Sequence, residues 1–171
     1  GGDAKSLEVR CFAHYISKYD GGEFAKQVVV GDVHQDNADL MKCDRQTAKN
    51  TFFALIYGAS PTKISAMLDV DLVHAEKLID NLFRKRPEMQ HLIAGIKRAA
   101  QSRGHLRGLD GRKLIPRSVH SSVNLLIQAA GACVAKQAAI NMREYIIDNK
   151  MGCLGVRLVG FIHDEILIEA P

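Results

Sequence analysis

Two cations and two aromatic rings recur at four-residue intervals in this sequence. They are Arg45, Lys49, Phe53 and Tyr57. On an α-helix each step of four residues drifts by only about 40° around the axis. The four side chains would therefore form one stripe, with cations suited to phosphates at one end and rings suited to a base or sugar at the other. A solvated helix face is the alternative, but it does not explain why the cations align with the rings.

An acidic pair, Asp164 and Glu165, follows His163 between two apolar runs. The runs predict strands over 156–162 and 165–169, which would place the pair at the tip of a β-hairpin. The two acids could be ordinary turn residues. However, acids between two buried strands need a compensating partner, and carboxylate oxygens favour a hard divalent cation.

A phosphoryl-transfer site with two metal ions needs carboxylates from more than one segment. Asp3 would join Asp164 if the start of the chain lay beside the last hairpin. The sequence contains no Gly-rich phosphate loop of the Walker type, so phosphate binding would have to come from side chains. Two amides, Asn124 and Gln128, are also four residues apart on a predicted helix. Such amides can bind base edges, although satisfied internal amides remain an open alternative.

The elements that must position these residues are mostly helical. Asp32 and Asp44 are suitable N-caps, and Pro61 suits the first turn of a helix. An Asp-Gly turn at 110–111 predicts a small hairpin. The predicted helices are 9–19, 32–42, 45–57, a short one near Pro61, 71–85, 87–102 and one from Ser118 or Ser121 to about Asn149, and the small hairpin pairs 105–108 with 113–115.

The composition is that of a folded globular protein with one core or two small lobes. The 171 residues are 47% hydrophobic and 25% charged, and the net charge of +4 tolerates nucleic acid without demonstrating it. Unevenly spaced Cys11, Cys43, Cys133 and Cys153 predict reduced thiols. No apolar run approaches the roughly 20 residues of a membrane span, so we expect no membrane contact. The missing initiator Met predicts a fragment of a longer protein.

Three segments resemble motifs A, B and C of family A DNA polymerases, and they occur in the same order. They are residues 3–10, the stripe from 45 to 58, and residues 163–165. Connecting segments 31–34, 108–113 and 117–120 resemble the short phage replicative branch of that family. The resemblance covers essentially the whole chain.

This resemblance implies an α+β fold that is an incomplete polymerase right hand. Mostly helical fingers, residues 12–104, would be inserted into part of an antiparallel-sheet palm, residues 1–11 and 105–171. A thumb and any exonuclease domain would lie outside the chain. The implied activity is template-directed addition of deoxynucleoside triphosphates to a primer 3′-hydroxyl.

The resemblance also assigns metal and catalytic roles. Asp3 and Asp164 would bind two Mg²⁺ ions together with the carbonyl oxygen of Ala4. Glu165 would be a further catalytic carboxylate that tunes the site rather than binding metal. Lys49 would protonate the leaving pyrophosphate.

Nucleotide-binding roles fall on the stripe and its neighbours. His34, Arg45 and Lys49 would grip the triphosphate, and Phe53 would pack on the nucleotide. A Phe there, rather than Tyr, is associated in this family with rejection of dideoxynucleotides. Glu8 would exclude a ribose 2′-hydroxyl, with Tyr57 holding it in place. Ala54 departs from the Gly that many relatives have.

The resemblance also implies DNA contacts, partners and a cellular location for the protein. Asn124 and Gln128 would contact the minor groove of the template–primer, and His163 would contact the primer terminus. The partners would be primer–template DNA and deoxynucleoside triphosphates. A phage-encoded protein in the cytoplasm of a bacterial host is implied, and a processivity factor for the full-length protein stays open.

Two rival functions remain at this point. A single-subunit phage-type RNA polymerase shares much of this pattern, but Glu8 and Glu165 argue against it, because a ribonucleotide enzyme should not keep a bulky gate against the 2′-hydroxyl. A non-catalytic nucleic-acid-binding fragment is the other. Asp3, Asp164, Arg45 and Lys49 are all present, which argues against a polymerase that has lost its activity.

Overall fold

The computed structural model describes residues 4–162 and 165–171. Asp3, His163 and Asp164 lie outside these residues. The described elements, in chain order, are α1 (Leu7–Asp20), α2 (Glu23–Val30), α3 (Val33–Met41), α4 (Arg45–Ile56), α5 (Pro61–Leu68), α6 (Leu72–Lys85), α7 (Pro87–Arg103), β1 (Leu106–Arg107), β2 (Lys113–Leu114), α8 (Ser122–Asp148), the 3₁₀ turn η1 (Met151–Leu154), β3 (Arg157–Ile162) and β4 (Glu165–Glu169).

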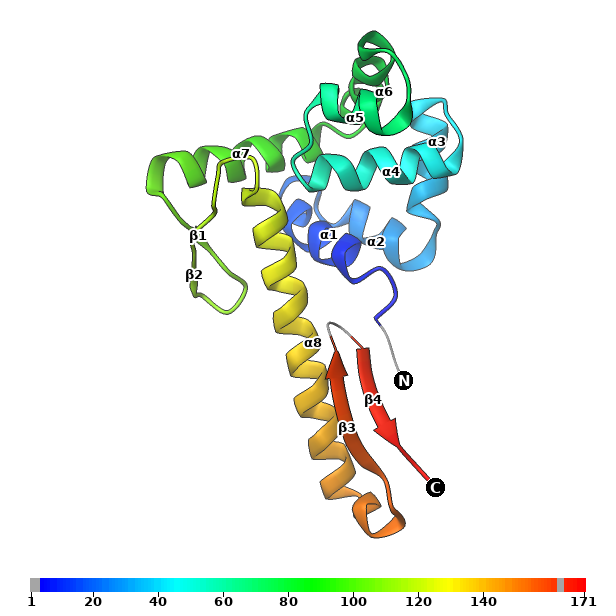
Figure 1. The fold of residues 1–171 in the computed structure, drawn as a ribbon, viewed down its shortest axis with the longest axis vertical. Helices are drawn as coiled ribbons and strands as arrows, with labels where there is room; N and C mark the ends of the chain where they lie inside the picture. Colours follow the sequence, from blue (N-terminus) through cyan, green and yellow to red (C-terminus); the bar gives the residue numbers. More distant parts are fainter. Residues whose placement is uncertain (1–3, 163–164) are drawn as a thin grey trace.

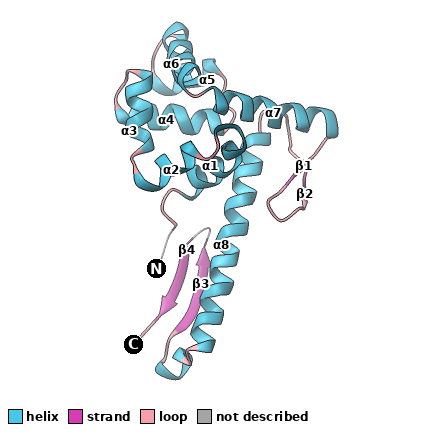
Figure 2. Cartoon of the chain, turned by 180° about the vertical axis from the view of Figure 1, so that it is seen from behind, coloured by secondary structure: helices cyan, strands magenta, loops and turns pink. Residues whose placement is uncertain are grey.

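Helices α1 to α7 gather into one body, called here the helical block. Figure 1 shows α8 leaving this block as a single long helix, with the β3–β4 hairpin lying along its far half. The small β1–β2 hairpin connects α7 to the start of α8. The chain is therefore mostly helical with two small antiparallel sheets, as Figure 2 shows by element type.

The predicted helix starts are confirmed by their caps. The Asp32 carboxylate accepts hydrogen bonds from the backbone N–H groups of His34 and Gln35, and Asp44 does the same for the second and third residues of α4. These bonds satisfy donors that a helix cannot satisfy internally. Pro61 occupies the first turn of α5, where its missing N–H costs nothing.

Helix α2 was not predicted, and hydrogen bonds to a side chain just before it help to explain why it forms. The Asp20 carboxylate accepts from the N–H groups of Gly22 and Phe24, each at 2.8 Å. Phe24 and Val28 are one turn apart and both are buried. The three β-branched valines at its end have low helix propensity, so burial of Phe24 and Val28 outweighs the local preference.

The core of the helical block is built around three phenylalanines from three helices. Phe12, Phe24 and Phe52 have ring centroids 5.8–6.4 Å apart, and each is at most 1% exposed. They join α1, α2 and α4. The orientation of α4 is thus set by its buried face, which leaves the opposite face for function.

Both predicted hairpins are present. In the second, Arg157 is opposite Glu169 and Ile162 is opposite Glu165, with a register irregularity between Leu158 and Gly160. The expectation that these strands are buried is wrong for the described residues: Val159 is 59% exposed and Ile162 is 56% exposed. Only one face of this two-stranded sheet lies on α8, so apolar composition alone overstated the burial.

The statement that no apolar run approaches a membrane span must also be corrected. Helix α8 is, by length and composition alone, long and apolar enough to cross a membrane. In the structure it packs against α1, α7, β1 and β3. These contacts bury part of its apolar surface, and several of its large apolar side chains stay exposed, among them Ile140 at 50% and Ile147 at 55%.

All four cysteines lie among the described residues, and all are free thiols. This confirms the pattern expected from their spacing. Burial raises the pKa of the Cys11 thiol, and the nearby Glu8 charge raises it further. Cys11 is therefore protonated and unreactive at neutral pH.

Candidate functional site

Helix α4 turns one face to the core and the other to the candidate site. Ala48, Phe52 and Leu55 are buried, whereas Lys49 and Phe53 are half-buried. Phe53 and Tyr57 have ring centroids 6.1 Å apart with planes tilted by 32°. The predicted stripe is thus a surface of cations followed by rings.

Arg45, at the start of the stripe, is held by an ion pair. Its Nε donates to Asp32 Oδ2 at 2.9 Å and its Nη2 donates to Asp32 Oδ1 at 3.2 Å. The hydrogen bond from Arg45 lowers the pKa of Asp32. One carboxylate therefore caps α3 and orients the first cation of α4.

His34 lies beside the stripe and is only 8% exposed. Its ring contacts Phe52 and Phe53, with centroids 6.0 and 5.6 Å away. Burial lowers the pKa of His34, and the positive charge of Arg45 lowers it further. Its Nδ1 has no hydrogen-bond partner among the residues that the structure describes. A neutral imidazole beside two cations is suited to hydrogen bonding with an anionic ligand.

Glu8, in the first turn of α1, accepts hydrogen bonds from one residue at the end of α4 and one residue on α8. Tyr57 Oη donates to Glu8 Oε2 at 2.6 Å, and Gln128 Nε2 donates to Glu8 Oε1. Burial raises the pKa of Tyr57, and the bond to Glu8 raises it further, so the phenol remains a donor. The contact between Tyr57 and Glu8 is the one that the family resemblance implied.

Two hollows flank this cluster. The first, about 360 Å³, lies between α1 and α8 and is lined by Leu7, Glu8, Ile127, Gln128, Gly131, Ala132 and Ala135. The second, about 320 Å³, lies between α4 and α5 and is lined by Asn50, Phe53, Ala54, Tyr57, Ala59, Lys63 and Met67. The Glu8–Tyr57 pair therefore separates two spaces large enough for small organic groups.

The end of α4 is pressed against the loop before α8. Gly58 has φ of +81°, and a Cβ atom built there would lie 2.1 Å from the carbonyl oxygen of His120. Only glycine can combine this backbone conformation with such a close approach. This contact places the end of α4 directly beside the turn that precedes α8.

The predicted acidic site is described only in part. Ala4 is exposed in the segment before α1, and Glu165 is exposed at the start of β4. In Figures 1 and 2 this segment lies near the end of the hairpin where β3 stops and β4 starts. Among residues 4–162 and 165–171, no group of three or more His, Cys, Asp or Glu could hold a metal ion.

The two predicted DNA-binding amides on α8 have different surroundings. Asn124 is half-buried, and its Oδ1 has no partner within the described part of the chain. Gln128 is exposed but bonded to Glu8. Sequence reasoning did not find this contact, nor Asp32 as the partner of Arg45. Both join residues distant in the chain, and spacing carries no signal for such pairs.

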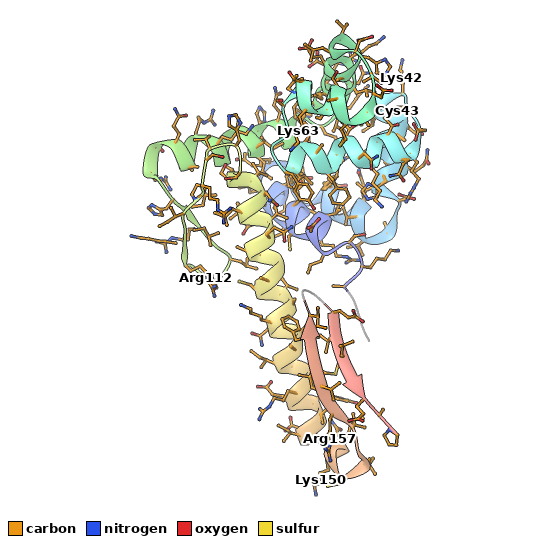
Figure 3. All side chains as sticks on the ribbon, in the orientation of Figure 1. Lys42, Cys43, Lys63, Arg112, Lys150 and Arg157 are labelled. Atoms are coloured by element: carbon orange, nitrogen blue, oxygen red, sulfur yellow. The ribbon has the colours of Figure 1, made fainter. Side chains whose placement is uncertain are left out.

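Positive charge is not concentrated at one place. Figure 3 shows Lys42 at the helical block, Arg112 at the β1–β2 hairpin, and Lys150 and Arg157 at the far end of α8 and β3. The net charge of +4 is thus spread over the molecule. The local cations of α4 are more informative than the overall balance.

Comparison with known proteins gives one consistent result. Residues 2–171 match the model of the family described as DNA polymerase family A. The DNA-directed DNA polymerase of Enterobacteria phage T3 is 31% identical over 186 residues, which is 98% of this chain and 26% of that protein. The enzyme of Escherichia phage T7 is 30% identical over the same shares. DNA polymerase I of Chloroflexus aurantiacus is 28% identical over 99% of this chain and 20% of the relative.

A solved structure supports the same fold. The POL domain of Pol1 from M. smegmatis, in complex with DNA primer-template and dNTP, matches with a TM-score of 0.80 at 20% identity. The match covers 98% of this chain and 32% of that chain. The chain spans about a quarter of the length of the phage relatives.

Proposed function

The chain belongs to DNA polymerase family A, and from this membership we propose that it carries the nucleotide-selecting part of a template-directed DNA polymerase. The reaction is addition of a deoxynucleoside triphosphate to a primer 3′-hydroxyl. The observation that carries the proposal is the hydrogen bond from Tyr57 to Glu8 at 2.6 Å. It joins motif A to the end of the cation-and-ring stripe on α4.

The stripe supports a defined orientation for the nucleotide. Arg45 and Lys49 bind the triphosphate, since guanidinium and ammonium groups are suited to phosphate oxygens. Neutral His34 donates a further hydrogen bond. Phe53 packs on the sugar and base, and Glu8 lies where a ribose 2′-hydroxyl would otherwise fit. Lys49 gives a proton to the leaving pyrophosphate.

The proposed metal ligands fit Mg²⁺ by their chemistry. Carboxylates of Asp3 and Asp164 with the carbonyl oxygen of exposed Ala4 form an all-oxygen donor set, which hard cations prefer. Two bound Mg²⁺ ions would supply activation of the primer hydroxyl and neutralisation of the phosphate charge. Exposed Glu165, at the start of β4, tunes this site without binding metal.

Residues 12–104 form the fingers and residues 1–11 and 105–171 form part of the palm in this proposal. The boundary between residues 11 and 12 lies inside α1, so one continuous helix belongs to both parts.

Helix α4 closes on the correct nucleotide and carries the triphosphate toward the palm, an induced-fit step that supports selectivity. A fluorophore on α4 that reports no change with correct nucleotide would contradict this closure.

The proposed partners follow from the same reaction. Primer–template DNA is contacted by Asn124, Gln128 and His163, and deoxynucleoside triphosphates are the substrates. The M. smegmatis neighbour was solved in complex with DNA primer-template and dNTP, which supports this proposal. We place the protein in the cytoplasm of a bacterial host, encoded by a phage, and leave a processivity factor open.

Primer extension by the full-length protein that carries this sequence tests the function. Deoxynucleotides and ribonucleotides are supplied in parallel, with Asp164→Asn as the test variant and Asp148→Asn, at the end of α8, as the matched control. Deoxynucleotide addition that only Asp164→Asn abolishes is the expected result. Ribonucleotide addition would indicate an RNA polymerase, and DNA binding without addition would indicate a binding module.

A further inference from the structure

The Glu8 carboxylate is held from two sides. Tyr57 donates to Oε2 and Gln128 donates to Oε1. A single donor fixes one oxygen and leaves the carboxylate plane free to turn about that bond. Donors on both oxygens fix the plane as well, because each occupies a separate acceptor.

The space in front of Glu8 is kept open by small residues on the helix that carries Gln128. Gly131, Ala132 and Ala135 line the same groove of about 360 Å³ as Glu8 and Gln128. A Cβ atom on Gly131 would lie 3.5 Å from Leu7, so α1 and α8 approach closely here. Glu8 and Gln128 thus stand on two directly packed helices at the edge of an open site.

We propose that Gln128 is a positioning residue for sugar selection, which it serves by holding the Glu8 carboxylate against the 2′ position of the incoming nucleotide. This inference rests on the proposed polymerase function. The amide retains a second N–H and its carbonyl oxygen, which stay available for DNA. Gln128 therefore links sugar selection to the same helix that contacts the duplex.

The role of Gln128 differs from that of Tyr57 because the two residues belong to different helices. Tyr57 ends α4, the helix that moves in the proposed closure. Gln128 lies on α8, which packs on the α1 helix of Glu8. The bond from Gln128 can therefore persist while α4 moves, so Glu8 is already oriented when the nucleotide arrives.

Gln128→Met in the full-length protein tests this role, since methionine keeps the length of the side chain but removes the donor. We expect the ratio of kcat/KM for deoxynucleotides over ribonucleotides to fall about tenfold, the value of one hydrogen bond to a charged group. The Kd for template–primer should also rise, because methionine lacks the amide groups that are proposed to contact DNA. Gln137→Met is the matched control, because Gln137 lies on the same helix and donates to Asn141 instead.

A Glu8→Ala background shows whether Gln128 acts through Glu8. Adding Gln128→Met there should cause no further loss of discrimination, because residues that act as a unit are non-additive. An equal additional loss would overturn the proposal. So would weakened DNA binding with unchanged discrimination, which would make Gln128 a DNA contact only.

Thermal unfolding tests the contact without activity. The same two substitutions form a double-mutant cycle, and non-additive changes in Tm support the Gln128–Glu8 bond. Additive changes would overturn it. If the parent protein adds no nucleotide while the cycle is non-additive, the polymerase function fails but the positioning contact stands.

Discussion

Arg45 and Asp32 form a two-point ion pair that joins the first turn of α4 to the N-cap of α3. The nucleotide phosphates proposed to bind Arg45 must compete with this carboxylate. Asp32 thus orients the cation and at the same time weakens its interaction with an anionic ligand.

Asp32→Asn should raise nucleotide affinity by about two- to fivefold, the range expected when one exposed ion pair is removed. Asn also caps helices well, so α3 should be retained. Equilibrium nucleotide binding by the full-length protein measures the effect. Asp44→Asn is the control, since Asp44 caps α4 with an equal charge but makes no bond to Arg45. Equal gains in the two variants would assign the effect to net charge.

Lys49→Ala should slow the chemical step by about 10²–10⁴-fold while changing DNA affinity little, because a general acid acts on the leaving group only in the transition state. Rapid-quench measurements at saturating nucleotide separate the two quantities. Lys26→Ala provides a control, because Lys26 pairs with Glu23 on the surface of α2. Comparable losses in chemistry and DNA binding would contradict the assigned role.

Neighbouring phenylalanines of α4 should respond differently to the same substitution. Phe53→Tyr should raise incorporation of dideoxynucleotides and change the free energy of unfolding by less than about 0.5 kcal/mol, since Phe53 is half-buried beside a hollow. Phe52→Tyr should cost about 1–3 kcal/mol, because Phe52 is fully buried and its new hydroxyl would lose water. Urea unfolding and dideoxy termination assays measure the two effects. Equal destabilisation would contradict the assigned faces of α4.

His34 should make stability depend on pH. Burial and the nearby cations lower its folded pKa below the unfolded value of about 6.5. The unfolded chain therefore binds the proton more readily, and stability falls as pH drops through about 6.5 and below. The Tm of His34→Gln should fall less than that of the parent between about pH 7.5 and 5.5. Exposed His14 provides the control, and a His14→Gln variant should keep the parental slope.

Gly58→Ala should destabilise the protein by about 1–3 kcal/mol more than Gly111→Ala. The two glycines have φ of +81° and +83°, so the backbone strain of alanine is the same at both. Only Gly58 would bring its Cβ against the His120 carbonyl, whereas Gly111 has open space. Denaturant unfolding of both variants isolates the contact, and equal losses would show that the loop before α8 can retreat.

Local chemistry made much of this fold predictable from the sequence. Aspartate caps, Pro61 and the Asp-Gly turn each act within a few residues, so their elements began and ended near the expected positions. Helix α2 was missed because the predicted helix 9–19 is followed by Asp20, Gly21 and Gly22, which signal a turn, whereas the Asp20 carboxylate also bonds to the first turn of α2. Burial of β3 and β4 was overestimated, since it depends on what packs against them rather than on their own composition.

The candidate site was predictable along α4 but not across helices. A four-residue interval determines which side chains share one helix face, and the stripe follows from it. The bonds from Gln128 to Glu8 and from Arg45 to Asp32 depend on how separate helices pack. The acids Asp3 and Asp164, outside the described residues, remain predictions.

The unbroken length of α8 has a mechanical consequence. Its 27 residues extend about 40 Å, from the helical block to η1. A tilt of about 5° at the contact with α1, near Gly131, would move the far end of α8, about 25 Å away, by about 2 Å, a large part of a hydrogen-bond length. Gly131 packs near Leu7 at the point about which such a tilt would occur. The packing of α8 on α1 therefore limits how far the β3–β4 hairpin, which lies along the far half of α8, can shift relative to the helical block.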